Sequence, residues 1–146
     1  MVLDANILLY AYDSKSTLHV VAREWLEAAL SDVTPIGLPW QSVLAFLRIS
    51  TDLRLAGTRL TVEQATQLVE SWLEQPNVLL LPTTGDHWPI FRRMLDEGQA
   101  RGPLVSDAHL AALAIENGAV LHTTDRDFAR FSGLRWHNPL ARASKR

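Results

Sequence analysis

The feature that most constrains the fold is a regular alternation of short apolar runs with longer segments of helical periodicity. The apolar runs lie at residues 2–3, 36–38, 78–81 and 119–122. A typical helical segment spans residues 17–30, where apolar side chains recur every three or four positions. Strands separated by helices favour a parallel sheet with helices on both of its faces. We therefore predict an α/β fold, a three-layer α/β/α sandwich around a central, mostly parallel sheet.

Local signals give the expected elements their bounds. Thr61-Val-Glu-Gln64 matches a capping box that opens a helix. The continuous apolar run 78–81 is typical of a parallel strand covered on both faces. A fifth strand is expected at 134–136, and the five tryptophans are expected to lie mostly in the core. Helices are expected at 6–12, 17–30, 41–53, 61–74, 86–100, 106–117 and 125–131.

Length and composition limit the domain organisation. The chain has 146 residues, which suits one domain, and we assign residues 1–140 to it. Residues 141–146 form a basic tail that is expected to be disordered. The absence of cysteine excludes a disulfide framework, a cysteine-ligated zinc site and a thiol nucleophile. No apolar run is long enough for a membrane span and no signal-like stretch follows Met1, so we expect a cytoplasmic protein without a membrane partner.

Acidic residues follow the predicted strands at the edge where ligands bind in open α/β sheets. Asp4 follows the first apolar run, Asp125 and Asp127 follow the run 119–122, and Asp107 lies at the start of a predicted helix. Taken singly, each is more simply a helix cap or a first-turn acid. Brought together, such carboxylates would repel one another unless a cation neutralised them. Oxygen ligands of this kind suit Mg²⁺, with Mn²⁺ as the alternative, rather than zinc.

Three acidic motifs together resemble a known family. They read VLDANILLY at 2–10, SDAHLAALA at 106–114 and TTDRDF at 123–128. In this order they resemble the PIN domain, and more narrowly the VapC ribonuclease toxins of bacterial toxin–antitoxin pairs. The segments LPW at 38–40, FLRIST at 46–51 and WHNP at 136–139 are similar to the same subgroup. The resemblance spans residues 1–140 and implies the α/β/α fold that the periodicity also predicts.

The resemblance assigns roles to individual residues. It implies that Asp4, Asp107 and Asp125 bind the metal, and that Asp127 serves a second ion or acts as a base. All four aspartates are thus the predicted catalytic residues, while Asn6 and Thr124 are expected to position them. Many PIN domains carry a glutamate on the helix that follows the second strand, and the residue aligned with it is Phe46. Whether the site holds one ion or two therefore stays open.

The charge balance depends on how these acids are counted. The chain carries 16 acidic and 14 basic residues, a net charge of −2 that argues against a nucleic-acid partner. Excluding the four aspartates leaves 12 acids against 14 bases, a mildly basic remainder. Arg48, Arg54 and Arg126 then become candidates for phosphate contacts, although a solvated surface charge is the simpler interpretation of each.

The predicted function is a Mg²⁺-dependent endoribonuclease that acts as a toxin and hydrolyses RNA phosphodiesters by a metal-activated water. The resemblance also implies a cognate antitoxin protein as partner and a homodimer. One alternative is a PIN module that binds RNA or protein without turnover. Another is a haloacid-dehalogenase-like phosphatase, because Asp4-x-Asn6 resembles the opening motif of that class. The five histidines include no H-E-x-x-H pair that would favour zinc.

Overall fold

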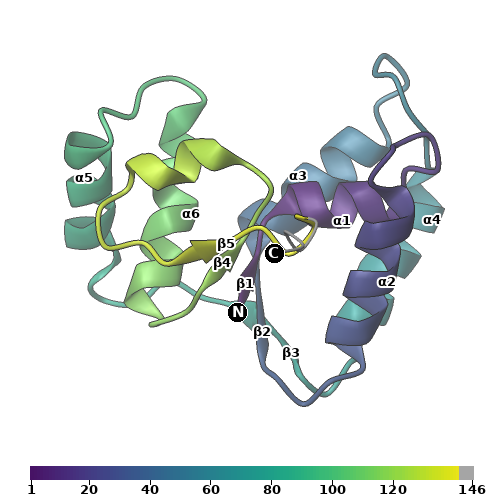
Figure 1. Ribbon diagram of the computed structural model, residues 1–146, viewed down its shortest axis with the longest axis horizontal. Coiled ribbons are helices and arrows are strands. Elements are labelled where there is room, and N and C mark those ends of the chain that lie inside the picture. Colours follow the sequence, from purple (N-terminus) through teal and green to yellow (C-terminus); the bar gives the residue numbers. More distant parts are fainter. Residues whose placement is uncertain (142–146) are drawn as a thin grey trace, which may run out of the picture.

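The computed structural model describes residues 1–141, so most of the predicted tail, residues 142–146, lies outside the described residues. Its centre is a five-stranded sheet in the order β3-β2-β1-β4-β5, and every neighbouring pair is parallel (Figure 1). The strands are β1 (Val2–Leu3), β2 (Ile36–Pro39), β3 (Val78–Leu81), β4 (Leu121–His122) and β5 (Trp136–His137). The predicted parallel sheet is therefore confirmed.

Helices cover both faces of this sheet. On one side lie α1 (Ala5–Tyr12), α2 (His19–Leu30), α3 (Trp40–Ser50) and α4 (Val62–Leu73). On the other side lie α5 (His87–Glu97), α6 (Leu104–Glu116) and the short 3₁₀ helix η1 (Arg126–Arg130), as Figure 1 shows. This confirms the three-layer α/β/α architecture. No helix of residues 1–141 is long and apolar enough to cross a membrane.

The two faces of β1 explain why the core divides into two clusters. Neighbouring side chains of a strand point to opposite faces. Leu3 accordingly belongs to a cluster with the helices α1 to α4, whereas Val2 belongs to a cluster with α5, α6 and η1. Both side chains are almost completely buried. The two side chains of this short apolar run thus contact both helical layers.

Several predicted boundaries agree with the structure and others shift. The capping box at Thr61 is present, since its hydroxyl accepts from the Gln64 N–H and its own N–H donates to the Gln64 side chain. The helix predicted over 106–117 begins earlier, at Leu104. The last strand lies at Trp136–His137 rather than at 134–136.

One expectation about burial is wrong. The run 78–81 forms the edge strand β3 rather than a doubly covered one, and Leu79 is about half exposed. Continuous apolarity cannot distinguish an edge strand from a central one when only part of its outer face is covered.

The expectation that the tryptophans lie mostly in the core is met by three of the five: Trp72 is buried, and Trp25 and Trp136 pack against the two clusters. Trp40 and Trp88, each in the first turn of a helix, are exposed.

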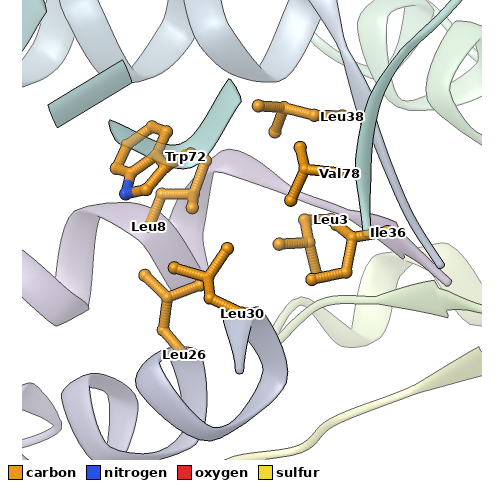
Figure 2. Close-up of a pocket in the computed structure, with 8 residues that line it drawn as sticks. All are labelled: Leu3, Leu8, Leu26, Leu30, Ile36, Leu38, Trp72 and Val78. Carbon is orange, nitrogen blue, oxygen red and sulfur yellow. The ribbon is translucent and has the colours of Figure 1, made fainter. Parts of the chain in front are cut away.

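The interface between α2 and the sheet is densely packed. Figure 2 shows Leu26 and Leu30 of α2 pointing toward Leu3 and Ile36 of the sheet, with Leu8 and Trp72 closing one side. The gap left between the eight apolar side chains is only about 10 Å³. A void of this size with wholly apolar walls stays dry, so the interface is held by direct side-chain contact.

We predict that Leu26→Ala lowers the free energy of unfolding by about 3 kcal/mol, because it enlarges this gap and removes buried methyl groups. Leu26 is fully buried, whereas Val20 on the same helix is 66% exposed. Urea denaturation of Leu26→Ala beside Val20→Ala measures the difference. The Val20 variant should change stability by less than about 0.5 kcal/mol. Equal effects of the two variants would contradict the packing described.

Candidate metal centre at the carboxyl edge of the sheet

The sheet places two distant segments side by side at one edge. The chain enters the sheet at β1, continues to β2 and β3 on one side, and returns to β4 on the other. Crevices that bind ligands form at such a reversal of strand order. The Asp4 N–H donates to the His122 carbonyl over 3.0 Å, so the residues after β1 and β4 lie together. This pairing brings Asp4 next to residues 123–125.

A buried hydroxyl holds the Asp4 carboxylate in place. The Thr123 hydroxyl donates to Asp4 Oδ2 over 2.7 Å, and the Asn6 amide donates to the same oxygen over 3.1 Å. The amide of Asn6 also contacts the Thr123 oxygen at 3.0 Å. Thr123 itself is completely buried. Burial raises the pKa of Asp4, and the Thr123 hydrogen bond opposes that rise.

The sequence predicts that Thr124 positions the acidic residues, but in the structure Thr123 does so. Thr124 contributes its backbone N–H, which lies 3.5 Å from Asn6 Oδ1. The hydroxyl that contacts Asp4 is that of Thr123, the first residue after β4. The alternation of side chains at the strand end could have indicated this. In contrast, Asn6 contacts Asp4 directly, in the manner expected of a positioning residue.

Asp125 combines a helix-capping contact with a place at the site. Its carboxylate accepts from the Asp127 N–H over 2.8 Å and so caps η1. Its own N–H donates to the Thr123 hydroxyl over 3.1 Å. The simpler interpretation as a cap is therefore correct for Asp125, and it coexists with a position beside Asp4. Asp127 is exposed and lies farther out on η1.

The charges that act on Asp107 show that the site carboxylates lie close together. Asp107 lies in the first turn of α6 and is half-buried. Burial, followed by the charges of Asp125, Asp4 and Asp127, raises its pKa to about 6. The nearby Arg130 opposes this rise. Four predicted site residues are thus near enough to interact electrically, and Arg130 is a cation at the site that the sequence analysis did not single out.

An open groove of about 950 Å³ lies in front of these carboxylates. Its walls include Asp4, Asp107 and Asp125 on one side and residues of α3 on the other. The groove-facing residues of α3 include Gln41, Leu44 and Arg48, none of which is acidic. The groove is therefore acidic at the sheet edge, apolar in its middle and basic at the end of α3.

Phe46 does not stand in this groove. Its ring is completely buried and contacts Tyr12 and Trp72, with ring centroids 6.0 and 4.8 Å apart. The residue aligned with the glutamate of many PIN domains therefore lies in the core of this chain and not in its groove. The polar residue that α3 places in the groove near Asp107 is Gln41, whose amide donates to the Ser106 carbonyl over 2.7 Å.

A histidine network supports the far wall of the groove. His109 Nδ1 lies 2.5 Å from the Gln41 side-chain oxygen, and its ring contacts that of His87. His87 Nδ1 in turn lies 3.1 Å from the carboxylate of Glu116, which is almost fully buried. Burial, followed by the neighbouring His87, lowers the pKa of His109. The His109 ring therefore serves as a packing and hydrogen-bonding group in the wall of the groove.

The three predicted arginines are dispersed. Arg48 lines the groove. Arg54 is exposed and forms a two-point ion pair with Asp52, with N–O distances of 3.0 and 2.9 Å. Arg126 is exposed on η1. Of the three, only Arg48 stands in the groove.

The side chains at this edge that could hold a cation are carboxylates. Among residues 1–141, no three acidic or imidazole side chains already form a complete ligand set. The nearest protein ligands are carboxylate oxygens, and burial followed by the neighbouring carboxylate charges raises the pKa of Asp107. Mg²⁺ is commonly bound by one or two carboxylates with water completing its coordination. Asp4, Asp107 and Asp125 are therefore the residues that could hold such a cation.

Comparison with known proteins assigns this chain to a family. The profile of the PIN domain matches residues 1–134. The chain belongs to the PIN-domain family. This membership excludes the haloacid-dehalogenase-like alternative.

Within that family the chain groups with VapC proteins. It is 41% identical over 140 residues to Ribonuclease VapC37 of Mycobacterium tuberculosis, which covers 96% of this chain and 97% of that protein. It is 39% identical over 137 residues to Ribonuclease VapC33 of the same organism, over 94% and 96% of the two chains. A chain of VapBC2 from Rickettsia felis, solved bound to a promoter DNA fragment, shares the fold with a TM-score of 0.66 at 17% identity, over 94% of this chain and 96% of that one.

We predict that Asp107→Asn stabilises the metal-free protein at pH 7.5 by about 1 kcal/mol, a value reduced for partial solvent exposure. The folded state raises the pKa of Asp107, so between about pH 4 and 6 it binds more protons than the unfolded state. Its stability therefore falls as the pH rises through that window. Asparagine removes the penalty, and the gain should vanish below pH 4.

Thermal unfolding in EDTA across this pH range measures the effect. Asp86→Asn, which changes an exposed aspartate at the start of α5, is the matched control. A gain that is the same at pH 4 and pH 7.5, or that also appears in the control, would contradict the clustering of charge at Asp107.

Proposed function

We propose that this chain is a metal-dependent endoribonuclease and the toxin of a VapBC-type toxin–antitoxin pair. The observation that carries the proposal is the convergence of Asp4, Asp107 and Asp125 on one groove, where burial and then the neighbouring carboxylate charges raise the pKa of Asp107 to about 6. A chain gains no stability from such a cluster by itself. The relationship to Ribonuclease VapC37 supports the same activity.

Asp4, Asp107 and Asp125 would hold the ion, with Asp127 as an outer acid. When bound, Mg²⁺ or Mn²⁺ lowers the pKa of a coordinated water and neutralises charge on a phosphate oxygen. The protein's contribution is the orientation of the ligands. Thr123 and Asn6 fix the Asp4 carboxylate through hydrogen bonds to Oδ2, so that its other oxygen can face the groove.

The remaining groove residues are arranged to bind a single-stranded phosphodiester. Arg48 offers a guanidinium for a phosphate next to the one that reacts. Trp40 and Leu44, which are 57% and 62% exposed, give apolar surface on which unstacked bases can lie. Asp107, with its raised pKa, can hold a proton at its carboxyl near neutral pH when no cation is bound.

A cognate antitoxin would bind over the same groove. Its exposed Trp40, Leu44 and Val105 side chains are the kind of apolar surface that a partner covers. The VapBC complexes that share this fold support an antitoxin as that partner. A homodimer is proposed as the assembled form of this chain, on the resemblance alone.

The second candidate function is a PIN module that binds RNA without cutting it. One observation favours it: α3 places Gln41, a neutral residue, in the groove where an acidic one would complete the carboxylate set. Such a module would retain RNA binding through Arg48 and the apolar groove. Cleavage and binding must therefore be measured on the same samples.

We predict that purified protein cleaves single-stranded RNA in Mg²⁺ or Mn²⁺, that EDTA abolishes cleavage, and that Asp4→Asn reduces the rate by about 100-fold or more. The isosteric change removes one charge while keeping the hydrogen-bonding shape. Gel analysis of end-labelled RNA gives the rates, and Asp86→Asn is the control at an exposed carboxylate.

Retention of cleavage by Asp4→Asn, or in EDTA, would refute the metal-dependent nuclease. RNA binding without cleavage by the wild-type protein would instead establish the binding module. Filter binding at the same RNA concentrations separates these outcomes.

A further inference from the structure

A second cavity lies beside the acidic groove. It has a volume of about 190 Å³ and is enclosed by the ends of α1 and α3 and by the loop that follows α3. Its apolar walls are formed by Leu9, Phe46, Ile49 and Leu60. The cavity is large enough for several waters or one planar ring, and it is a separate space from the dry gap beneath α2.

Two polar atoms in this cavity lack a partner. Ser50 Oγ and Arg59 Nε are buried and form no hydrogen bond with any part of the chain that the structure describes. Ser50 is only 4% exposed. Arg59 also lines the cavity and is anchored by Nη1, which donates to the Ile49 carbonyl over 2.9 Å. Buried polar atoms without partners are unfavourable, and they mark a place where a ligand or water completes the hydrogen bonds.

A carboxylate and a glycine complete the polar end of the cavity. Asp13 lines it and holds the loop by accepting from the N–H groups of Thr58 and Lys15, over 2.9 and 3.1 Å. Gly57 has φ +109° and passes between Asp13 and Arg59, where a Cβ would lie 2.7 Å from a side-chain atom of each. The loop can approach this closely only with glycine. The lining of the cavity thus includes two residues with an unpartnered polar atom, Arg59 and Ser50, and a carboxylate, Asp13.

The cavity adjoins the groove. Leu9 and Ile49 line both spaces. Leu9 follows Asp4 by five residues along α1, which corresponds to about 7.5 Å at the rise of an α-helix. Arg48, next to Ile49, faces the groove. An RNA strand whose phosphate lies at Asp4 could therefore place a base of a neighbouring nucleotide into the cavity.

We propose that this cavity is a nucleobase pocket, which takes a base with a ring carbonyl beside a ring N–H from RNA bound in the groove. The inference rests on the proposed function. The carbonyl would accept from Arg59 and Ser50, and the N–H would donate to Asp13. Guanine and uracil carry this edge, whereas adenine and cytosine present an amino donor beside a ring acceptor. Unstacked bases held on their polar edges are the usual means by which proteins read single-stranded RNA.

A binding experiment without metal or phosphate tests the pocket alone. Guanosine, uridine, adenosine and cytidine are titrated in EDTA, and the NMR signals of Arg59 Nε–H and of the Leu9 and Ile49 methyl groups are followed. We expect guanosine or uridine to shift these signals, and which of the two binds identifies the base. Ser50→Ala should weaken that binding by about fivefold, as expected for one neutral hydrogen bond. Ser71→Ala, at an exposed serine of α4, is the matched control.

Cleavage mapping provides the second readout. On a mixed-sequence RNA, the wild-type protein should prefer the same base at a fixed position near the cut, and Ser50→Ala should reduce that preference by a similar factor. Arg59→Lys, which removes Nε–H and keeps the charge, is the second variant. Failure to cut any RNA, with nucleoside binding retained, would refute the nuclease and leave the pocket standing.

The pocket is overturned if no nucleoside shifts these signals, if all four shift them alike, or if Ser50→Ala and Ser71→Ala behave the same. Each of these results means that the cavity does not recognise a base through Ser50 and Arg59.

Discussion

The hydrogen bond from the Thr123 hydroxyl to the Asp4 carboxylate joins residues that are 119 positions apart in the chain. It exists because β1 and β4 are neighbours in the sheet although they come from opposite ends of the sequence. The same hydroxyl accepts from the Asp125 N–H, so one buried oxygen fixes two acidic residues relative to each other. The groove and its proposed chemistry depend on this junction, and the two helical layers hold the strands that form it.

The carboxylates proposed to bind the cation lower the stability of the folded protein at this edge of the sheet. Burial and mutual repulsion raise the pKa of Asp4 and Asp107, so the folded protein carries carboxylates that would be more favourable in water. The densely packed layers on either side of the sheet offset that cost. A cation would remove the repulsion, and its binding would therefore also stabilise the fold. Clusters of groups with perturbed pKa values are typical of functional sites for this reason.

Much of the fold could be predicted from the sequence because strands and helices here obey local signals. The capping box at Thr61 and the apolar run that ends at Pro39 are examples. The edge position of β3 could not be predicted, since it depends on strand order. The acids of the site were found by their place after strands. Thr123 and Arg130 were missed because their importance arises from contacts across the fold. Phe46 was aligned with a site glutamate, yet it lies in the core, because a core position and a groove position on α3 can be adjacent in sequence.

The proposed function requires three or four carboxylates to share one space that a hard cation fills. The most direct measurement is an NMR titration of the Asp107 carboxyl carbon, performed in EDTA and again with saturating Mg²⁺. We expect a pKa of about 6 in EDTA and a clearly lower pKa with Mg²⁺, because the ion offsets the repulsion from Asp125 and Asp4 with attraction. An ordinary aspartate pKa in EDTA that does not respond to Mg²⁺ would contradict it.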